Sequence, residues 1–351
     1  MRYSLWIFLI ILLIIRLITT TPHYKNDQML KMTAVLYSEP STSGSDIIFN
    51  LSGIRVIGKG KDIHYGDKIE VVGKYEDGTL TKGDIKLLQP STSIFTTIRT
   101  KILSFYQKSV KQPNASLIGG ITIGAKSALP KRFSDKLKAT GTSHIVVASG
   151  MNITMLAEFV LSILLLVLTR RKALIITITC IWLYTLITGF EAPIIRAAVM
   201  ASIAFTSQIF GKVGNTLRIT TLTGLAMLIF VPSWIKDVGF LLSFSTTVSL
   251  ILFQAKVANL LKFLPSIIKE DLTTSIAAQI GSTPIILYFF GRVNLLSPLI
   301  NTLILWIVAP VMIVGAVAGA LSFISPGFAK IILLTIYPLT AWFIFVVNFF
   351  G

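Results

Sequence analysis

The sequence predicts a polytopic α-helical membrane protein, with about eight or nine membrane helices, that carries a small all-β domain. Of its 351 residues, 53% are hydrophobic and only 13% are charged, whereas about 25% of residues are charged in soluble domains. The mean hydropathy is +0.78, and apolar runs follow one another almost without a break from residue 114 onward. This composition excludes an ordinary soluble globular domain.

The chain is also strongly basic, with 32 Lys and Arg residues against 15 Asp and Glu and a net charge of +17. Such an excess suits contact with nucleic acid or with a phosphate-rich lipid surface. Basic cytoplasmic loops produce the same excess in many membrane proteins, and residues 22–111 hold 13 basic but also nine acidic residues. The charge is therefore compatible with a polyanionic ligand without indicating one by itself.

Neither a disulfide framework nor a metal centre is expected. Cys180 is the single cysteine and lies in an apolar run, and the three histidines, His23, His64 and His144, are far apart. No H-x-E or H-E-x-x-H spacing occurs, so we expect no catalytic zinc and no cofactor.

Residues 1–21 are predicted to form an N-terminal membrane anchor helix. An apolar run extends from Leu5 to Ile18 and is interrupted by Arg16. No small-residue cleavage site follows, so an uncleaved anchor is favoured over a cleaved signal peptide. Such an anchor places the residues after it outside the cytoplasm.

Residues 22–92 are predicted to form the all-β domain. Five short runs of alternating hydrophobicity are separated by turn signals such as Asp77-Gly78, which favours a closed barrel of the OB type. Such barrels bind single strands by stacking bases on aromatic rings beside lysines that neutralise phosphates; the alternative is a solvated β-domain whose aromatic residues form its core. The candidate DNA contacts are Tyr37, Lys59, Lys61, Tyr65, Lys68 and Lys74.

Residues 93–138 are predicted to form amphipathic or interfacial helices. Over 93–111, hydrophobic residues interleave with basic ones, which is typical of a helix lying on the membrane surface, although an ordinary packed amphipathic helix fits nearly as well. Arg99 and Lys101 on this helix join the candidate DNA contacts. Residues 117–129 are too short to span the bilayer and are expected to be re-entrant or interfacial.

Residues 139–351 are predicted to form a polytopic membrane domain. If the β-domain lies outside, the loops that face inward carry most of the basic residues, among them Arg170, Arg171 and Lys172, in agreement with the positive-inside rule. The run at 295–322 fits one long helix or two short ones around Pro310. The expected spans lie near 145–168, 173–190, 193–210, 217–234, 238–255, 273–290, 295–322 and 329–350.

Several polar residues fall inside these apolar runs, where they are costly unless partnered. The segment 141–152 contains His144, Ser149 and Asn152 and is interpreted as a polar pathway lining, with helix–helix hydrogen bonding and a Ser–His nucleophilic pair as alternatives. Arg196 lies one turn inside an apolar helix; it fits a phosphate contact in a pore, or equally a salt bridge to Glu191 or Glu158, or snorkelling to the interface. Residues 279–284 form a polar, kink-prone patch.

These residues fall into four ordered motifs, by which the chain resembles the ComEC-type competence family, the DNA internalisation channels of naturally transformable bacteria. The motifs are GTSHIVVASGMN at 141–152, TG at 188–189 with RAAVM at 196–200, DVGFLLSF at 237–244, and AQIGSTP at 278–284 followed by FG at 290–291. The motif residues expected to line or shape the path are Gly141, Ser143, His144, Ser149, Gly150, Asn152, Gly189, Arg196, Asp237, Gly239, Ser243, Gln279 and Pro284.

The resemblance implies that 139–351 is a competence-type channel domain of the inner membrane, which passes single-stranded DNA inward and is not itself an enzyme. It also implies membrane lipid, a DNA receptor, a helicase and a separate nuclease as partners. Many members end in a metallo-β-lactamase-like domain, but the sequence contains no H-x-H-x-D-H motif. Asn152 stands where His is commoner, Leu241 where Gln is, and Ala125-Lys126 replace Asp-Arg. Alternative functions are an intramembrane enzyme that uses Ser149 and His144, and a transporter of a small anion or polymer.

Overall fold

The computed structural model describes residues 2–20, 24, 26–37, 40–43, 46–51, 54–60, 63–76, 78–125, 129–147, 149–211, 215–291 and 293–351. The strands are β1 (Met29–Val35), β2 (Ser41–Ser43), β3 (Asp46–Leu51), β4 (Ile54–Lys59), β5 (Lys68–Glu76) and β6 (Thr79–Gln89). The helices are α1 (Arg2–Thr20), α2 (Ile94–Ser109), α3 (Asn114–Ile123), α4 (Lys131–Thr140), α5 (Gly150–Leu165), α6 (Arg170–Thr188), α7 (Ala192–Ile209), α8 (Thr216–Phe230), α9 (Val238–Leu260), α10 (Ser266–Phe290), α11 (Ser297–Leu321), α12 (Pro326–Leu334) and α13 (Tyr337–Phe350), with a 3-10 turn at Pro232–Lys236.

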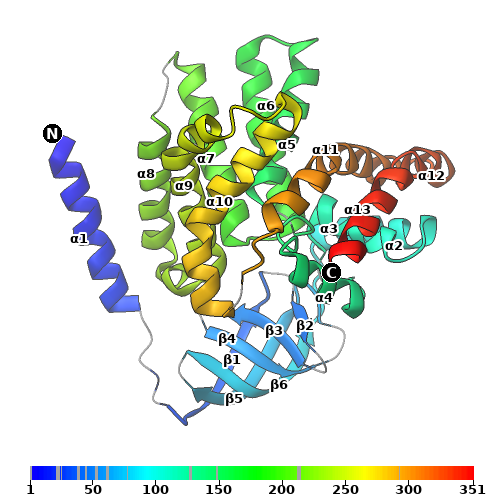
Figure 1. Cartoon of the computed structure of the whole chain (residues 1–351). Helices are drawn as coiled ribbons and strands as arrows, with labels where there is room; N and C mark the ends of the chain where they lie inside the picture. Colours follow the sequence, from blue (N-terminus) through cyan, green and yellow to red (C-terminus); the bar gives the residue numbers. More distant parts are fainter. Residues whose placement is uncertain are drawn as a thin grey trace.

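Figure 1 shows the sheet below a group of upright helices, α5 to α10, with α2 to α4 and α11 to α13 beside them. Helix α1 stands on the other side, where Arg16 Nε donates to the Ile229 carbonyl at the end of α8 at 3.0 Å. The described part of the chain is thus mostly helical and apolar, and the prediction of a helical membrane protein is confirmed.

The β-domain (residues 24–90) contains a six-stranded sheet in the order β1-β5-β6-β4-β3-β2. Five strands were expected; the additional one is the short β2, which pairs with β3. The end strands of the order, β1 and β2, are joined by residues 36–40. A flat sheet would hold them about 24 Å apart, which is more than the roughly 20 Å that this connection can span, so the sheet is bent.

Hydrophobic residues alternate along these strands and meet in a core of their own. In β4, for example, Ile54 and Val56 are buried while Arg55 is exposed. The buried residues of this core are Leu30, Leu36, Ile47, Phe49, Leu51, Ile54, Val56, Ile63, Ile69, Val71, Leu80 and Ile85. All of them lie within the β-domain, which therefore has the packing of a unit able to fold by itself.

The expected eight or nine membrane spans are not confirmed. In the described residues, four helices are long and apolar enough to cross a membrane, namely α6, α7, α9 and α11, and the pair α12 and α13, bent by 49°, makes a fifth if it is one span. Helices α5 and α8 have 16 and 15 residues, fewer than the about 20 that a span needs. Helix α11 continues for 25 residues through Pro310, so the apolar run at 295–322 is one long helix.

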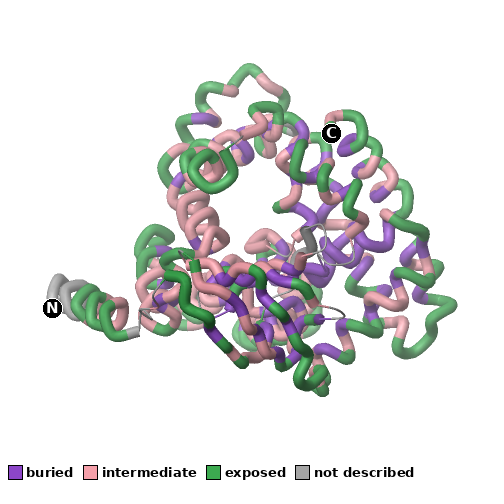
Figure 2. Tube along the Cα trace, turned by 90° about the horizontal axis from the view of Figure 1, so that it is seen from below, coloured by how far each residue is buried: buried purple, intermediate pink, exposed green. Residues whose placement is uncertain are grey.

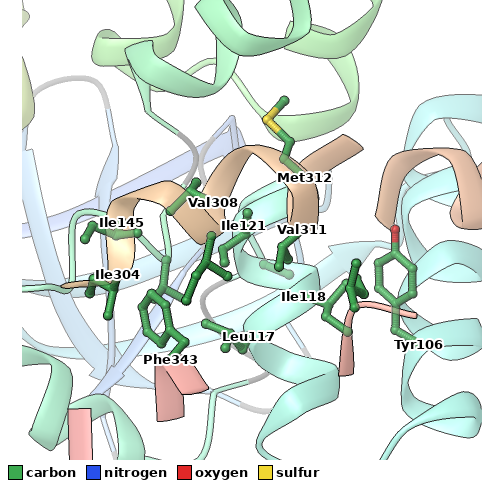
Figure 3. Packing of buried hydrophobic residues seen from close by; sticks show 14 of the residues in the cluster. Tyr106, Leu117, Ile118, Ile121, Ile145, Ile304, Val308, Val311, Met312 and Phe343 are labelled. Atoms are coloured by element: carbon green, nitrogen blue, oxygen red, sulfur yellow. The ribbon is translucent and has the colours of Figure 1, made fainter. Parts of the chain in front are cut away.

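The largest hydrophobic core surrounds α11 (Figure 3). Val308 and Val311 of α11 pack with Leu117 and Ile118 of α3 and with Phe343 of α13. Every residue of α3 is buried, so the segment that is too short to span lies inside the protein. Helix α2 packs here too through Ile102 and Tyr106.

Burial is much less complete among the upright helices (Figure 2). Each residue from Leu241 to Val248 of α9 is partly exposed, although a helix packed on a core normally has one buried stripe. The partner α10 contacts α9 closely, because Ser249 Oγ donates to the Ala277 carbonyl at 2.6 Å and Ser245 Oγ donates to that of Gly281. Small residues at this contact allow the two backbones to approach.

Candidate functional site

Arg196 brings three of the sequence motifs together. Pro193 occupies the first turn of α7, where its missing N–H costs nothing, and Arg196 follows one turn later. Its Nε donates to Ser243 Oγ of α9 at 2.6 Å. Its Nη2 lies so close to the start of α5 that a Cβ added at Gly150 would be 2.8 Å away. The sequence predicted these three residues individually but not that they are adjacent.

Among the residues that the structure describes, the partners of Arg196 are all uncharged. Besides Ser243, they are Met200 Sδ, 3.4 Å from Nη1, and the ring of Phe244, whose centroid is 5.8 Å from the guanidinium carbon. No ion pair joins Arg196 to Glu158, Glu191 or any other acidic residue that the structure describes. A guanidinium held only by a hydroxyl, a thioether and a ring retains its affinity for a phosphate or carboxylate.

Asp237 links α9 to the β-domain. Its Oδ1 accepts a hydrogen bond from the Phe240 backbone N–H at 2.8 Å and thereby caps the helix. Its Oδ2 accepts a second bond, from Asn50 Nδ2 of β3, also at 2.8 Å. Gly239 leaves room for this arrangement, since a Cβ there would be 3.0 Å from Asp237 Oδ1. Asp237 therefore has a structural role that its motif did not specify.

The segment 141–152 is held by hydrogen bonds to its surroundings. Gly141 ends α4 with a φ of +73°, and a Cβ there would lie 2.8 Å from Ser297 Oγ of α11. Ser149 Oγ donates to Asn152 Oδ1 at 3.1 Å, and Asn152 Nδ2 donates to the Ile121 carbonyl of α3 at 2.7 Å. Asn152 is fully buried, so it joins α5 to α3 and does not line an open path in this conformation.

No catalytic pair is formed in this segment. His144 Nδ1 lies 3.0 Å from the Gly141 carbonyl, whereas Ser149 bonds Asn152. Ser143 Oγ is buried without a hydrogen-bond partner among the described residues. Across all the residues that the structure describes, no group of three His, Cys, Asp or Glu side chains could hold a metal ion.

The fourth motif lies beside the first. Gln279 Nε2 of α10 donates to the Asn294 carbonyl at 3.2 Å, and Asn294 Nδ2 donates to the Ala139 carbonyl at 2.8 Å. Pro284 lies inside α10, which continues past it to Phe290. The motifs thus form two groups, one around Arg196 and one around Asn294.

Two of the expected DNA contacts are instead buried. Tyr65 is 8% exposed and donates to the Leu186 carbonyl at 3.1 Å, and burial raises the pKa of its hydroxyl, so that it remains a donor. Arg99 is 4% exposed; its Nη1 donates to the carbonyls of Ile123, Ile187 and Thr188, and its guanidinium carbon lies 5.7 Å from the Tyr65 ring centroid.

The assignment of these two residues to DNA binding is therefore corrected. Arg99 shares a helix face with Ile102 and Tyr106, at spacings of three and seven residues, and this periodicity could have shown that it points inward. Gly189, next to the Tyr65 ring, adopts a φ of +108°, a backbone conformation that favours glycine.

The remaining DNA candidates lie on the surface or are paired with acids. Tyr37 is 61% exposed, with its ring 6.4 Å from that of Phe190, and Lys59, Lys68 and Lys101 are exposed. Lys61 lies outside the described residues. Lys74 Nζ pairs with Asp27 at 2.8 Å and with Glu76 at 3.4 Å, and these hydrogen bonds raise its pKa.

Comparison with known proteins identifies the family. The model of the family described as "Competence protein" matches residues 121–351. The chain is 25% identical to ComE operon protein 3 of Bacillus subtilis, over 70% of this chain and 31% of that protein. It is also 25% identical to Competence protein ComA of Neisseria gonorrhoeae, over 57% of this chain and 30% of that protein. It thus spans about a third of the length of these curated relatives, and no solved structure matches it. The chain belongs to the competence protein family, as the ComEC-type motifs indicated.

Proposed function

We propose that this chain forms an inner-membrane channel that passes single-stranded DNA into the cell during natural transformation. The family supports a role in competence, and one observation of the site carries the proposal further: Arg196, on a helix able to span the membrane, has only uncharged partners. A phosphodiester in transit can replace the hydroxyl of Ser243 as the partner of its guanidinium.

Moving phosphates through lipid is costly. Each nucleotide carries one negative charge, which cannot cross hydrocarbon unaided. A path must therefore offer cations that bind a phosphate and release it again. An arginine fixed by a carboxylate would be neutralised, whereas one fixed by neutral groups can exchange its partners as each phosphate passes.

The exposure of α9 also supports a path beside it. Residues 241–248 have no fully buried face, and they include Ser243, Ser245, Thr246 and Thr247. We propose that one partly exposed side of this helix lines the path beside Arg196. These hydroxyls would give the weak contacts that let a strand move on.

We further propose that the β-domain is an OB-like barrel outside the membrane. Its parallel β4–β6 pair and its bent sheet, with β1 and β2 at the two ends of the strand order, support the fold. The basic residues Arg170, Arg171 and Lys172 begin α6, while Tyr65 contacts the opposite end of this helix at Leu186. By the positive-inside rule, this arrangement supports a β-domain on the outer face.

Tyr37, Lys59, Lys68 and Lys101 are the exposed candidates for first contact with DNA. A receptor, a helicase and a separate nuclease are proposed as partners, because a channel by itself supplies neither capture nor energy. The alternative of an intramembrane enzyme is not favoured, since Ser149 bonds Asn152 and His144 lies against the Gly141 carbonyl. The other alternative, a transporter of a small anion or polymer, differs from the proposed channel in what it carries, so measuring the transported molecule separates the two.

The test is DNA uptake in a strain that lacks this chain and is complemented with variants. Arg196→Ala should reduce uptake at least about tenfold, the loss expected when one charge-assisted contact is removed, with the protein present in the membrane at normal level. Arg218→Ala, at the start of α8, is the matched control. Unchanged uptake in Arg196→Ala contradicts the proposal, and transport of small anions but not of labelled single strands would favour the alternative.

A further inference from the structure

The β-domain contacts the membrane helices at the ends of the two helices that carry the Arg196–Ser243 pair. On the α9 side, Asn50 Nδ2 donates to Asp237 Oδ2 at 2.8 Å, directly at the helix cap. On the α7 side, the contacts fall on the turn that leads into the helix. The Tyr37 carbonyl accepts from the Phe190 backbone N–H of this turn at 3.1 Å, and Tyr65 donates to the Leu186 carbonyl in the last turn of α6, just before it.

Both contacts are close to the arginine along the helix axes. At 1.5 Å per residue, Arg196 lies about 6 Å from the first residue of α7, and Ser243 lies about 9 Å from Asp237. Two helical turns are stiff over such distances. A shift of the β-domain at either point therefore moves the start of one helix relative to the other and changes the distance between Arg196 and Ser243.

Arg99 secures the α7 side. Its guanidinium donates hydrogen bonds to carbonyls at the ends of α3 and α6, those of Ile123 (2.5 Å) and Ile187 (2.9 Å). It also lies over the Tyr65 ring. A cation at a helix C-terminus is favourable, so the end of α6 is firmly held. On the α9 side, the side-chain hydrogen bond that the described residues make with the β-domain is the one between Asn50 and Asp237, and it is exposed.

We propose that the β-domain positions α7 and α9 relative to each other at the Arg196 site, with Asn50 as the positioning residue. The inference rests on the proposed function of Arg196 and adds a second task to the β-domain. Besides offering a surface for DNA, the β-domain sets the geometry of the contact that holds the guanidinium. Movement of the β-domain when a strand binds would then change how Arg196 is held.

The contact can be broken and rebuilt by exchanging its donor and acceptor. Asn50→Asp places two carboxylates at hydrogen-bond distance and should lower DNA uptake about tenfold through their repulsion. Asn50→Asp combined with Asp237→Asn restores one donor and one acceptor, and Asn is as good a helix cap as Asp. Uptake should return to within about twofold of the wild type, the usual limit of additivity errors.

Two controls separate positioning from folding and from DNA capture. Gln89→Glu makes the same amide-to-carboxylate change at an exposed strand residue and should leave uptake unchanged. The isolated β-domain, which has its own core, should keep its circular dichroism spectrum and its DNA affinity when it carries Asn50→Asp. Loss of either would assign the uptake defect to the β-domain itself and overturn the proposal.

A double-mutant cycle tests the connection to Arg196. If Asn50 acts through the Arg196–Ser243 contact, Asn50→Asp should add no further loss to Ser243→Ala. The inference is overturned if the losses from Asn50→Asp and Ser243→Ala multiply in the double variant. It is also overturned if Asn50→Asp alone shows normal uptake, or if uptake does not recover in the exchanged pair. Normal uptake in Arg196→Ala, by contrast, contradicts the channel role of the arginine itself.

Discussion

Gly150→Ala is expected to disturb Arg196 while sparing the fold. The added Cβ would lie 2.8 Å from Arg196 Nη2 and 3.4 Å from the Ala197 Cβ, so the methyl group fits only if the guanidinium moves by several tenths of an ångström. The guanidinium is the end of a flexible side chain and can move. Its bond from Nε to Ser243 Oγ, 2.6 Å long, would then lengthen or break.

The expected magnitude follows from that bond. A hydrogen bond from a charged donor contributes about 1.5–3 kcal/mol, which corresponds to a roughly ten- to hundredfold loss of uptake if the full contact is needed. Stability should change little, because Gly150 is the first residue of α5 and does not adopt a positive φ that would favour glycine. The variant therefore separates function from folding.

The assay is uptake of labelled DNA in complemented cells, together with the thermal stability of the purified protein in detergent. Gly327→Ala in α12 is the matched control, since a Cβ there meets nothing within 4 Å. Normal uptake in Gly150→Ala would refute the importance of the guanidinium position. Loss of uptake with equal loss of folded protein would show that the glycine is needed for packing.

Arg99→Met should lower the melting temperature of the purified protein far more than Lys101→Met, because it leaves buried carbonyls unpaired at about 1–3 kcal/mol each; equal melting temperatures would contradict the buried role of Arg99. In the isolated β-domain, Asp27→Asn should lower the pKa of Lys74, measured by NMR titration. Because that pKa is raised by the Asp27 and Glu76 hydrogen bonds, their stabilising effect is present below the ordinary lysine range and is lost as pH rises through the raised pKa; an unchanged pKa contradicts the pairing. The same β-domain should bind single-stranded DNA less tightly as salt increases, and Lys59→Ala should reduce the salt slope by about 0.7 if Lys59 contacts a phosphate; absence of binding at low salt rules out a capture role.

Much of the architecture could be predicted because it follows from periodicity. Alternation along the strands and long apolar runs are local signals, and they located the sheet and most helices. The expected eight or nine spans are not confirmed, because the apolar runs near 145–168 and 217–234 contain helices of only 16 and 15 residues, α5 and α8, and an apolar run does not show how much of it is helical. Helix α3 was not expected to span because it is short, and the structure buries every one of its residues.

The pairing of side chains could not be predicted, because it depends on contacts between distant segments. Arg196 and Ser243 were both singled out, yet nothing in their spacing indicates that they bond. Asn50 was not singled out at all, since an exposed Asn on a strand resembles any solvated residue. Tyr65 was misassigned for a related reason: an aromatic residue at a turn looks the same whether it stacks on a base or docks on a neighbouring helix.

The uneven burial of the helices has a mechanical consequence. The cluster around α11 is packed like a protein interior and should exchange its amide protons only on global unfolding, whereas only Phe240, Ser249 and Val257 are buried among the 23 residues of α9. One half of the molecule can thus act as a stiff frame and the other as a compliant wall. Under the proposed channel function, α9 could then shift to let bases of different size pass, while the core around α11 stays folded.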